Sequence, residues 1–304
     1  MKPHTSTANI RGAGLMVLAM LGFAVEDMLI KQMAAGMPVG QIVLILGFGG
    51  CLIFGPITKA YGDTILTRDM LQPALLIRNL AELVGTVGFV SAIALTPLST
   101  ASAILQATPL VVTLGAALFL GETVGWRRWL AILIGLSGVL LIIRPGTETF
   151  DPKSLLAVIG VLGLAARDLA TRRVTQSVSS RVISLYAFAI SILTGLILLW
   201  LGVTGDTLVI PTSIDSIRLA AAVAIGIGAY YAIVTATRVG EMSVIAPFRY
   251  TRLVFALILG GIAFGERPDA MTLLGAVIVV TSGVYTLLRE AQLRSASKPD
   301  DAAL

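Results

Sequence analysis

Charged residues are scarce in this sequence. Asp, Glu, Lys and Arg make up only 13% of the 304 residues, whereas 56% are hydrophobic and the mean hydropathy is +0.92. A soluble domain carries about 25% charged residues. The composition therefore excludes a soluble globular protein and indicates an integral membrane protein.

Cysteine and histidine each occur once. Because Cys51 is a single cysteine, no intramolecular disulfide can form. It lies in an apolar stretch. His4 lies outside every apolar stretch, which leaves a histidine metal site and histidine-based catalysis in the membrane unsupported. A GxxxxGKS/T phosphate-binding loop is also missing, which excludes nucleotide hydrolysis by that route. We therefore expect no enzyme, no cofactor and no metal.

Ten apolar stretches are long enough to cross a membrane. A helix needs about 20 residues to span a hydrocarbon core of ~30 Å. We expect an all-α integral membrane protein, and the connections between its spans are mostly too short for a soluble domain. The expected spans are 13–33, 38–58, 71–94, 98–120, 127–144, 153–173, 181–203, 215–238, 243–264 and 269–288.

The basic residues are distributed unevenly between the two sides of these spans. Thirteen of the 22 Lys and Arg residues lie on the side of the two chain ends, and five lie on the opposite side. Because basic residues are enriched on the cytoplasmic side, we expect a multi-pass protein of a bacterial-type inner membrane with both termini in the cytoplasm. The net charge of +5 then reflects topology in the lipid bilayer, and we expect no nucleic acid partner.

Part of the first half recurs in the second half. At an offset of 141 residues, LGFAVEDMLIKQ (21–32) aligns with LGLAARDLATRR (162–173). This alignment matches Asp27 with Asp168. It indicates an internal repeat that includes the acidic residue of the first span.

A second repeated piece covers the fourth and ninth spans. At an offset of 144 residues, SAILQATPLVVTLGAALFLGE (102–122) aligns with APFRYTRLVFALILGGIAFGE (246–266), and Glu122 matches Glu266. Each half then holds five helices.

Because five is odd, the second half must enter the membrane from the opposite side, as in transporters built from inverted repeats. We expect a first five-helix repeat at 1–150, an inverted second repeat at 151–290, and a polar cytoplasmic tail at 291–304.

These features together resemble the EamA-type branch of the drug/metabolite transporter superfamily. The resemblance rests on the two five-helix repeats, the Gly-Glu pairs at 121–122 and 265–266, the Asp in spans one and six, and APFRYTRL at 246–253. It covers nearly the whole chain. It implies a ten-helix secondary transporter with a site between the repeats, and no particular substrate. Within the superfamily, the sequence looks most like the group with S-adenosylmethionine uptake carriers and bacterial relatives of vertebrate carboxylate carriers.

Eight ionisable residues fall inside the expected spans, four acidic and four basic. They are Glu26, Asp27, Arg78, Glu82, Arg167, Asp168, Arg249 and Arg252. A charge at the bilayer centre costs about 2.5–3.5 kcal/mol, so that eight unpaired charges would exceed the roughly 5–15 kcal/mol by which folded proteins are stable. These side chains must therefore pair, face water or bind a ligand.

Spacing indicates which of them share a helix face. Arg78 and Glu82 are four residues apart and can neutralise each other. Arg249 and Arg252 are three apart and need partners from other helices or an anionic ligand; the candidates on the protein are Glu26, Asp27 and Asp168.

Candidate site residues are the charges that depart from the repeat and their polar neighbours. The expected substrate-binding residues are Glu26, Arg78, Asn79, Glu82, Gln106, Tyr231, Arg249, Tyr250 and Arg252. For Asp27, Arg167 and Asp168 we expect a structural or gating role. Pro109 and Pro247 interrupt spans four and nine, and either frees backbone carbonyls for a cavity or only kinks its helix.

The sequence thus predicts a secondary active transporter that works by alternating access. Its substrate is a small zwitterionic or anionic metabolite, amino-acid-like or an organic acid, whose anionic group meets the arginines. Glu26 or Glu82 holds a cationic group or a proton. Proton coupling, exchange, direction and a homodimer stay open. The alternatives are a broad-specificity metabolite or drug exporter and a passive channel, and buried charges of both signs argue against the single-sign rings of pores.

Overall fold

Helices long and apolar enough to cross a membrane make up most of the molecule. The computed structural model describes residues 6–65, 71–122, 124–174, 178–239 and 241–296, and ten such helices lie in these ranges, without a strand. The helices are α1 (Ser6–Met33), α2 (Val39–Ala60), α3 (Pro73–Leu95), α4 (Leu98–Leu105), α5 (Thr108–Phe119), α6 (Trp126–Ile143), α7 (Ser154–Thr171), α8 (Ser180–Trp200), α9 (Ser213–Val239), α10 (Met242–Ile245), the 3-10 segment η2 (Ala246–Tyr250), α11 (Thr251–Phe264) and α12 (Ala270–Ala296).

All ten expected spans are present, with changes at their ends. The first helix begins at Ser6 and the last runs on to Ala296, so that part of the tail expected at 291–304 is helical. The remainder of that tail and His4 lie outside the described residues.

Spans four and nine are broken, as the prolines predict. The break in span four falls between α4 and α5, at residues 106–107, and Pro109 lies in the first turn of α5. In span nine, η2 separates α10 from α11, and Pro247 lies in η2. Proline lacks an amide hydrogen and is tolerated in a first turn, where that donor would have no helical acceptor.

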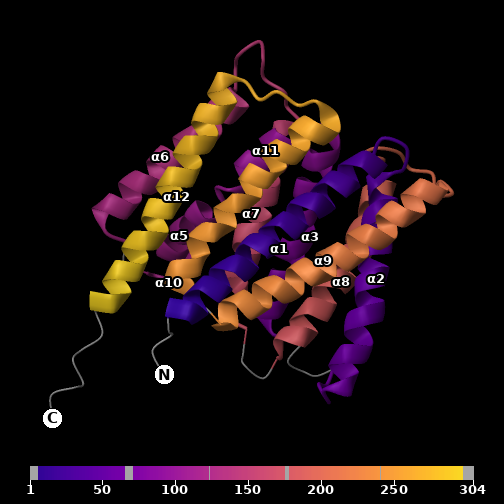
Figure 1. Cartoon of the computed structure of the whole chain (residues 1–304), viewed down its shortest axis with the longest axis horizontal. Helices are drawn as coiled ribbons and strands as arrows, with labels where there is room; N and C mark the ends of the chain where they lie inside the picture. Colours follow the sequence, from indigo (N-terminus) through magenta and orange to yellow (C-terminus); the bar gives the residue numbers. More distant parts are fainter. Residues whose placement is uncertain (1–5, 66–70, 123, 175–177, 240, 297–304) are drawn as a thin grey trace.

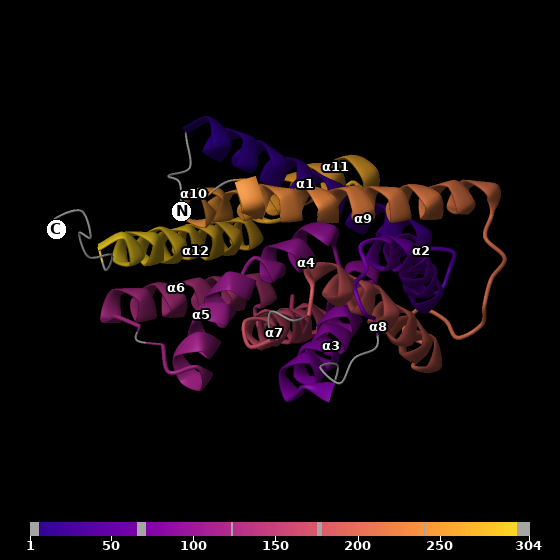
Figure 2. The same cartoon turned by 90° about the horizontal axis from the view of Figure 1, so that it is seen from below.

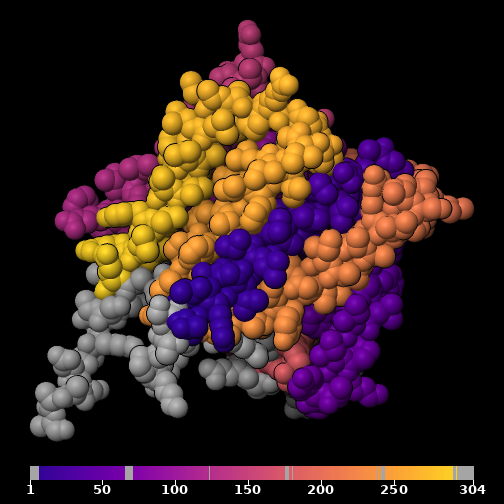
Figure 3. Space-filling model, in the orientation of Figure 1, coloured from indigo at the N-terminus to yellow at the C-terminus, as the bar shows by residue number. Residues whose placement is uncertain are grey.

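The bundle consists of two layers of helices. Figure 2 shows α12, α11, α1 and α9 in one layer and α6, α7, α3 and α8 in the other. The main contacts join α1 with α9, α2 with α8, α3 with α7 and α6 with α12. On the face shown in Figure 3, α1 lies between α11 and α9.

Glycines allow several of these helices to approach closely. A β-carbon at Gly163 of α7 would lie 2.3 Å from the backbone nitrogen of Gly85 in α3, and one at Gly138 of α6 would lie 2.8 Å from the carbonyl oxygen of Gly275 in α12. Small residues serve the same purpose in other membrane helix contacts, because packing there cannot rely on the hydrophobic effect. The close contacts hold the helices that carry the buried charges in fixed register.

Candidate functional site

Asp27 in α1 forms an ion pair with Arg252 at the start of α11. Arg252 donates to Oδ2 of Asp27 from Nη2 at 2.6 Å and from Nε at 3.1 Å. The rings of Phe23 and Phe89 each lie 5.4 Å from the guanidinium carbon, on α1 and α3. Asp27 is buried, so that the pair is largely shielded from water. Asp27 thus compensates the charge of Arg252, one of the two arginines of span nine.

A second cluster of four charges joins α3 to α7. Arg78 donates from Nη2 to Glu82 at 2.7 Å, as the spacing predicts, and Arg167 donates to the other oxygen of Glu82 at 3.1 Å. Arg167 also contacts Asp168, with Nε at 2.9 Å from Oδ1. Two cations and two anions compensate each other here, and the pair of Glu82 with Arg167 links the two halves of the chain.

The two clusters lie along the same face of α3. Glu82 of the second cluster and Phe89, which stacks against Arg252, are seven residues apart in this helix. Seven residues make two helical turns and a rise of roughly 10 Å. The buried charges therefore follow one line through the bundle, with contributions from α1, α3, α7 and α11.

Glu26 and Arg249 are the exceptions among the eight charges. In the part of the chain that the structure describes, neither side chain makes a hydrogen bond or ion pair. Glu26 lies against α9, where a β-carbon at Gly226 would be 2.7 Å from its Oε1, and within electrostatic range of Asp27 and Arg252. Arg249 lies in η2, half-buried and next to Tyr250. One free acid and one free base are left in a set that is otherwise neutral.

Two buried polar side chains lie at the helix breaks. Gln106 ends α4 and Tyr250 ends η2, at positions that the repeat aligns. Both are buried, and within the described residues the Nε2 atom of Gln106 and the hydroxyl of Tyr250 have no hydrogen-bond partner. The Tyr250 hydroxyl lies against Gly283 of α12, where a β-carbon would come within 1.7 Å. Unsatisfied buried donors are costly, which favours a functional role for these positions.

Of the candidate residues Tyr231 and Asn79, only Asn79 lies at a buried cluster. The side chain of Tyr231 is 72% exposed on the outside of α9, away from the buried clusters. Its neighbour Tyr230 points inward, where it shares a hydrogen bond with Ser184 and lies within electrostatic range of Arg78. Asn79 accepts a hydrogen bond from Arg78 at 3.0 Å. The sequence does not distinguish Tyr230 from Tyr231, because adjacent residues differ only by the 100° rotation of the helix.

Of the candidate acids for the arginines of span nine, Asp27 pairs with Arg252, and Asp168 pairs elsewhere. Asp168 pairs with its neighbour Arg167 instead of with Arg249 or Arg252, and Asp27 and Asp168 share no partner. No group of three His, Cys, Asp or Glu that could hold a metal ion occurs among the described residues. The arrangement contains charges of both signs in fixed pairs, together with Glu26 and Arg249, which make no ion pair within the described residues.

Comparison with known proteins gives the family of the chain. The sequence model of the EamA-like transporter family matches the chain twice, over residues 10–144 and 152–288. The chain belongs to the EamA-like transporter family. It is therefore a multi-pass membrane transporter and not an enzyme, and the resemblance to the drug/metabolite transporter superfamily is confirmed.

Relatives in this family have several different names. The chain is 23% identical over 285 residues to the S-adenosylmethionine uptake transporter of Rickettsia bellii, which covers 93% of this chain and 96% of the relative. It is 28% identical over 277 residues to the pseudopaline exporter CntI of Pseudomonas aeruginosa, with 89% and 94% covered. It is 26% identical over 282 residues to a riboflavin transporter of Vibrio cholerae, with 91% and 92% covered. All three are transporters of small metabolites.

A solved crystal structure has the same fold. It superposes with a TM-score of 0.61 at 20% identity and covers 94% of this chain and 99% of its own. The likeness extends over all ten spans and speaks for the fold alone.

Proposed function

We propose that this EamA-like transporter is a secondary active transporter that moves a small zwitterionic metabolite by alternating access. Glu26 binds the cationic group of the substrate and Arg249 binds its anionic group. The observation that carries the proposal is that these two half-buried charges, one of each sign, make no hydrogen bond or ion pair within the described residues, unlike the other six charges of the spans. Arg252 and Glu82, which the sequence also suggests as ligands, are held in ion pairs within the protein.

The cost of burying charge supports a zwitterion over a singly charged substrate. An uncompensated charge in a span costs about 2.5–3.5 kcal/mol. A zwitterion compensates Glu26 and Arg249 at the same time, whereas an organic anion would leave Glu26 without a partner. Gln106 and Tyr250, with unsatisfied donors at the helix breaks, add hydrogen bonds to the polar parts of the substrate.

The pairing of helices supports two inverted repeats at 1–150 and 151–290. Exchanging each span with the one five places later turns the contact of α1 with α9 into that of α7 with α3, and leaves the contacts of α2 with α8 and of α6 with α12 unchanged. Close contacts follow the same rule: Gly22 packs on Ala229 and Gly163 on Gly85, and the offsets of 141 and 144 exchange these two pairs. Such symmetry is the usual basis of alternating access.

The position of the chain ends supports a cytoplasmic location for both. In Figure 1, α1 begins and α12 ends at the same end of the bundle. Together with the excess of basic residues on that side of the spans, this favours both termini in the cytoplasm, with the protein in the inner membrane.

The name of one relative agrees with a metabolite that carries both charges, whereas riboflavin, named for another relative, carries neither an amino group nor a carboxylate. S-adenosylmethionine, named for one relative, carries an amino group and a carboxylate, whereas another relative is named as an exporter. Uptake and export therefore both remain compatible with the site.

Ligand-induced thermal stabilisation tests the proposal. The purified protein is heated with S-adenosylmethionine, L-methionine and riboflavin, and with methionine analogues that lack the amino group or the carboxylate. A ligand at 100 times its Kd stabilises by about 2.7 kcal/mol. We expect Glu26→Gln to weaken binding of the ligand with an amino group at least tenfold, without affecting the analogue that lacks it. We expect Arg249→Met to weaken binding of the ligand with a carboxylate at least tenfold, without affecting the analogue that lacks it.

Two surface variants serve as controls. Arg127→Gln removes an exposed cation and Tyr231→Phe alters an exposed hydroxyl, and both should keep wild-type ligand stabilisation. If Glu26→Gln and Arg249→Met, correctly folded, also keep it, these residues do not bind the substrate and the proposed site is wrong. For a ligand that stabilises the wild-type protein, uptake into proteoliposomes separates transport from binding alone.

A further inference from the structure

Glu266, just after α11, caps the N-terminus of α4 in the other half of the chain. Its two carboxylate oxygens accept hydrogen bonds from the backbone nitrogens of Leu98 at 2.6 Å and Ser99 at 2.9 Å, and Oε2 also accepts one from the Ser99 hydroxyl at 2.7 Å. The first amides of a helix have no acceptor within it, and Pro97 before α4 provides no side-chain cap. Glu266 therefore satisfies donors that would otherwise be free.

Lys31, near the end of α1, binds the end of α3, which the turn at Thr96 and Pro97 joins to α4. Its ammonium group donates to the carbonyl oxygens of Ile93, at 3.2 Å, and of Thr96 at the end of α3, and it lies 3.7 Å from Glu266. A cation at a helix C-terminus and an anion at a helix N-terminus are both favourable to the helix dipoles. The turn from α3 to α4 is thus clamped by one residue from each half.

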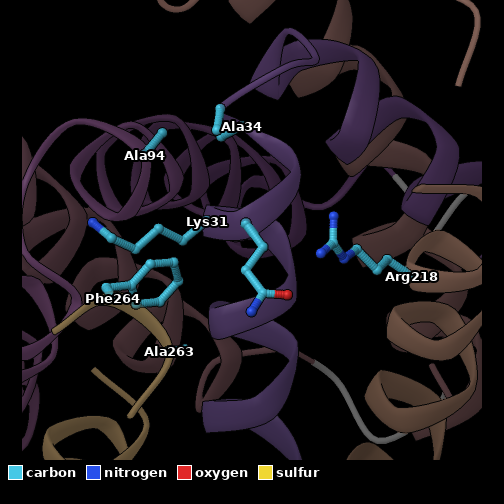
Figure 4. Close-up of a pocket in the computed structure, with 8 residues that line it drawn as sticks. Lys31, Ala34, Ala94, Arg218, Ala263 and Phe264 are labelled. Atoms are coloured by element: carbon cyan, nitrogen blue, oxygen red, sulfur yellow. The ribbon is translucent and has the colours of Figure 1, made fainter. Parts of the chain in front are cut away.

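The clamp closes one end of the bundle beneath a shallow pocket. Figure 4 shows the Lys31 side chain lying alongside the ring of Phe264, with Arg218 across the pocket. The ammonium group is 5.3 Å from the centre of that ring. Lys31 and Phe264 both line this pocket, which has a volume of about 470 Å³. Lys31 follows Asp27 by four residues in α1, which is about one helical turn.

The opposite end of the bundle carries the repeat-related residues in a different arrangement. Glu122 matches Glu266 and Arg172 matches Lys31, and they lie 3.2 Å apart. Their side chains are 42% and 44% exposed, against 10% and 15% for Glu266 and Lys31. In the described residues α11 packs against α4, whereas α5 makes no comparable contact with α10, the repeat-related segment. Glu122 and Arg172 thus pair with each other across the two halves, but within the described residues Glu122 does not cap α10 as Glu266 caps α4.

We infer that Glu266 with Lys31 and Glu122 with Arg172 are alternating gate locks, one at each end of the transport path. In the structure the first lock is engaged and the second is not. In the opposite state Glu266 releases α4, and Glu122 engages the backbone at the start of α10. The inference rests on the proposed alternating access, and it assigns the residues that hold each end closed.

Hydrogen–deuterium exchange of the ligand-free protein in lipid nanodiscs tests the inference. Peptides covering 97–105 and 241–250 report the two ends. We expect Glu266→Gln to speed exchange at Leu98 and Ser99 about tenfold and, at the same time, to slow exchange in 241–250 at least threefold, because release of one end lets the other close. Glu122→Gln is the matched control, and it should leave 97–105 protected and should not slow 241–250.

The response of the distant peptide decides the result. If Glu266 were only a helix cap, exchange at 97–105 would rise and 241–250 would not change, and this outcome would overturn the inference. Should Glu266→Gln fail to fold, Lys31→Met opens the same lock and is measured in the same way. Because no substrate is needed, a failed transport assay would refute the proposed function without affecting this measurement, and the reverse also holds.

Discussion

The ion pair of Asp27 with Arg252 makes a quantitative prediction about stability. The side chains are 6% and 19% exposed, so that each single substitution leaves a charge in a poorly solvated place. Removing one partner of a buried pair costs about 3–5 kcal/mol. We expect Arg252→Met to lie in this range, because it leaves Asp27 uncompensated and also removes two ring contacts worth about 0.5–1 kcal/mol each.

Asp27→Asn is expected to cost less than Arg252→Met. The stranded guanidinium remains over the rings of Phe23 and Phe89 and is the more exposed partner. Losing a hydrogen bond to a charged group costs about 1.5–3 kcal/mol. In the double variant neither charge remains, so its cost should fall short of the sum of the two single costs by about 2–3 kcal/mol, near the upper limit for residues in contact.

Reversible unfolding in mixed detergent micelles measures this coupling energy. The exposed pair of Glu122 with Arg172 provides the reference, because its side chains are 42% and 44% exposed and such pairs contribute at most about 1 kcal/mol. If the substitutions at Asp27 and Arg252 simply add, with a coupling energy below about 0.5 kcal/mol, the pair is not a desolvated ion pair. The account of how the buried charges are compensated would then be wrong.

Two further predictions concern packing and pH. Gly163→Ala places a β-carbon against the backbone of Gly85, which cannot move aside, and we expect a loss of about 1–3 kcal/mol from overpacking. Gly14→Ala, with open space around it inside α1, should be neutral or stabilise by up to about 1 kcal/mol in the same unfolding assay. The hydrogen bonds from Arg144 and Thr272 hold the pKa of Asp269, outside the spans, below its usual value of 3.8. The stability they add is present above pH 3.8 and is lost as the pH falls through the lower folded pKa, so the difference in melting temperature between wild type and Asp269→Asn should shrink from pH 7 to pH 3; a constant difference would contradict this.

The sequence predicts the spans and their breaks well, because hydropathy and proline act locally. All ten helices appear where apolar runs were expected, and spans four and nine are interrupted. The pair of Arg78 with Glu82 follows from spacing along one helix. Asp27 is one of the partners expected for Arg252.

Contacts between helices could not be predicted in the same way. The link from Arg167 to Glu82 depends on the rotation and depth of α7 against α3, and hydropathy sets neither. The same holds for Tyr230, which points inward where Tyr231 was expected to do so. The roles of the candidate residues, the inverted topology and a homodimer stay predictions.

The main helix contacts all join the first half of the chain to the second: α1 with α9, α2 with α8, α3 with α7 and α6 with α12. During synthesis, the first five spans therefore enter the membrane before any of their principal partners exists. Arg78 and Glu82 can pair within α3 from the start, but Asp27 receives its partner Arg252, and Glu82 its second partner Arg167, only as later spans emerge. The first half alone has charges without partners and glycine faces without neighbours. The order of synthesis therefore leaves the first half incompletely packed until the second half has entered the membrane.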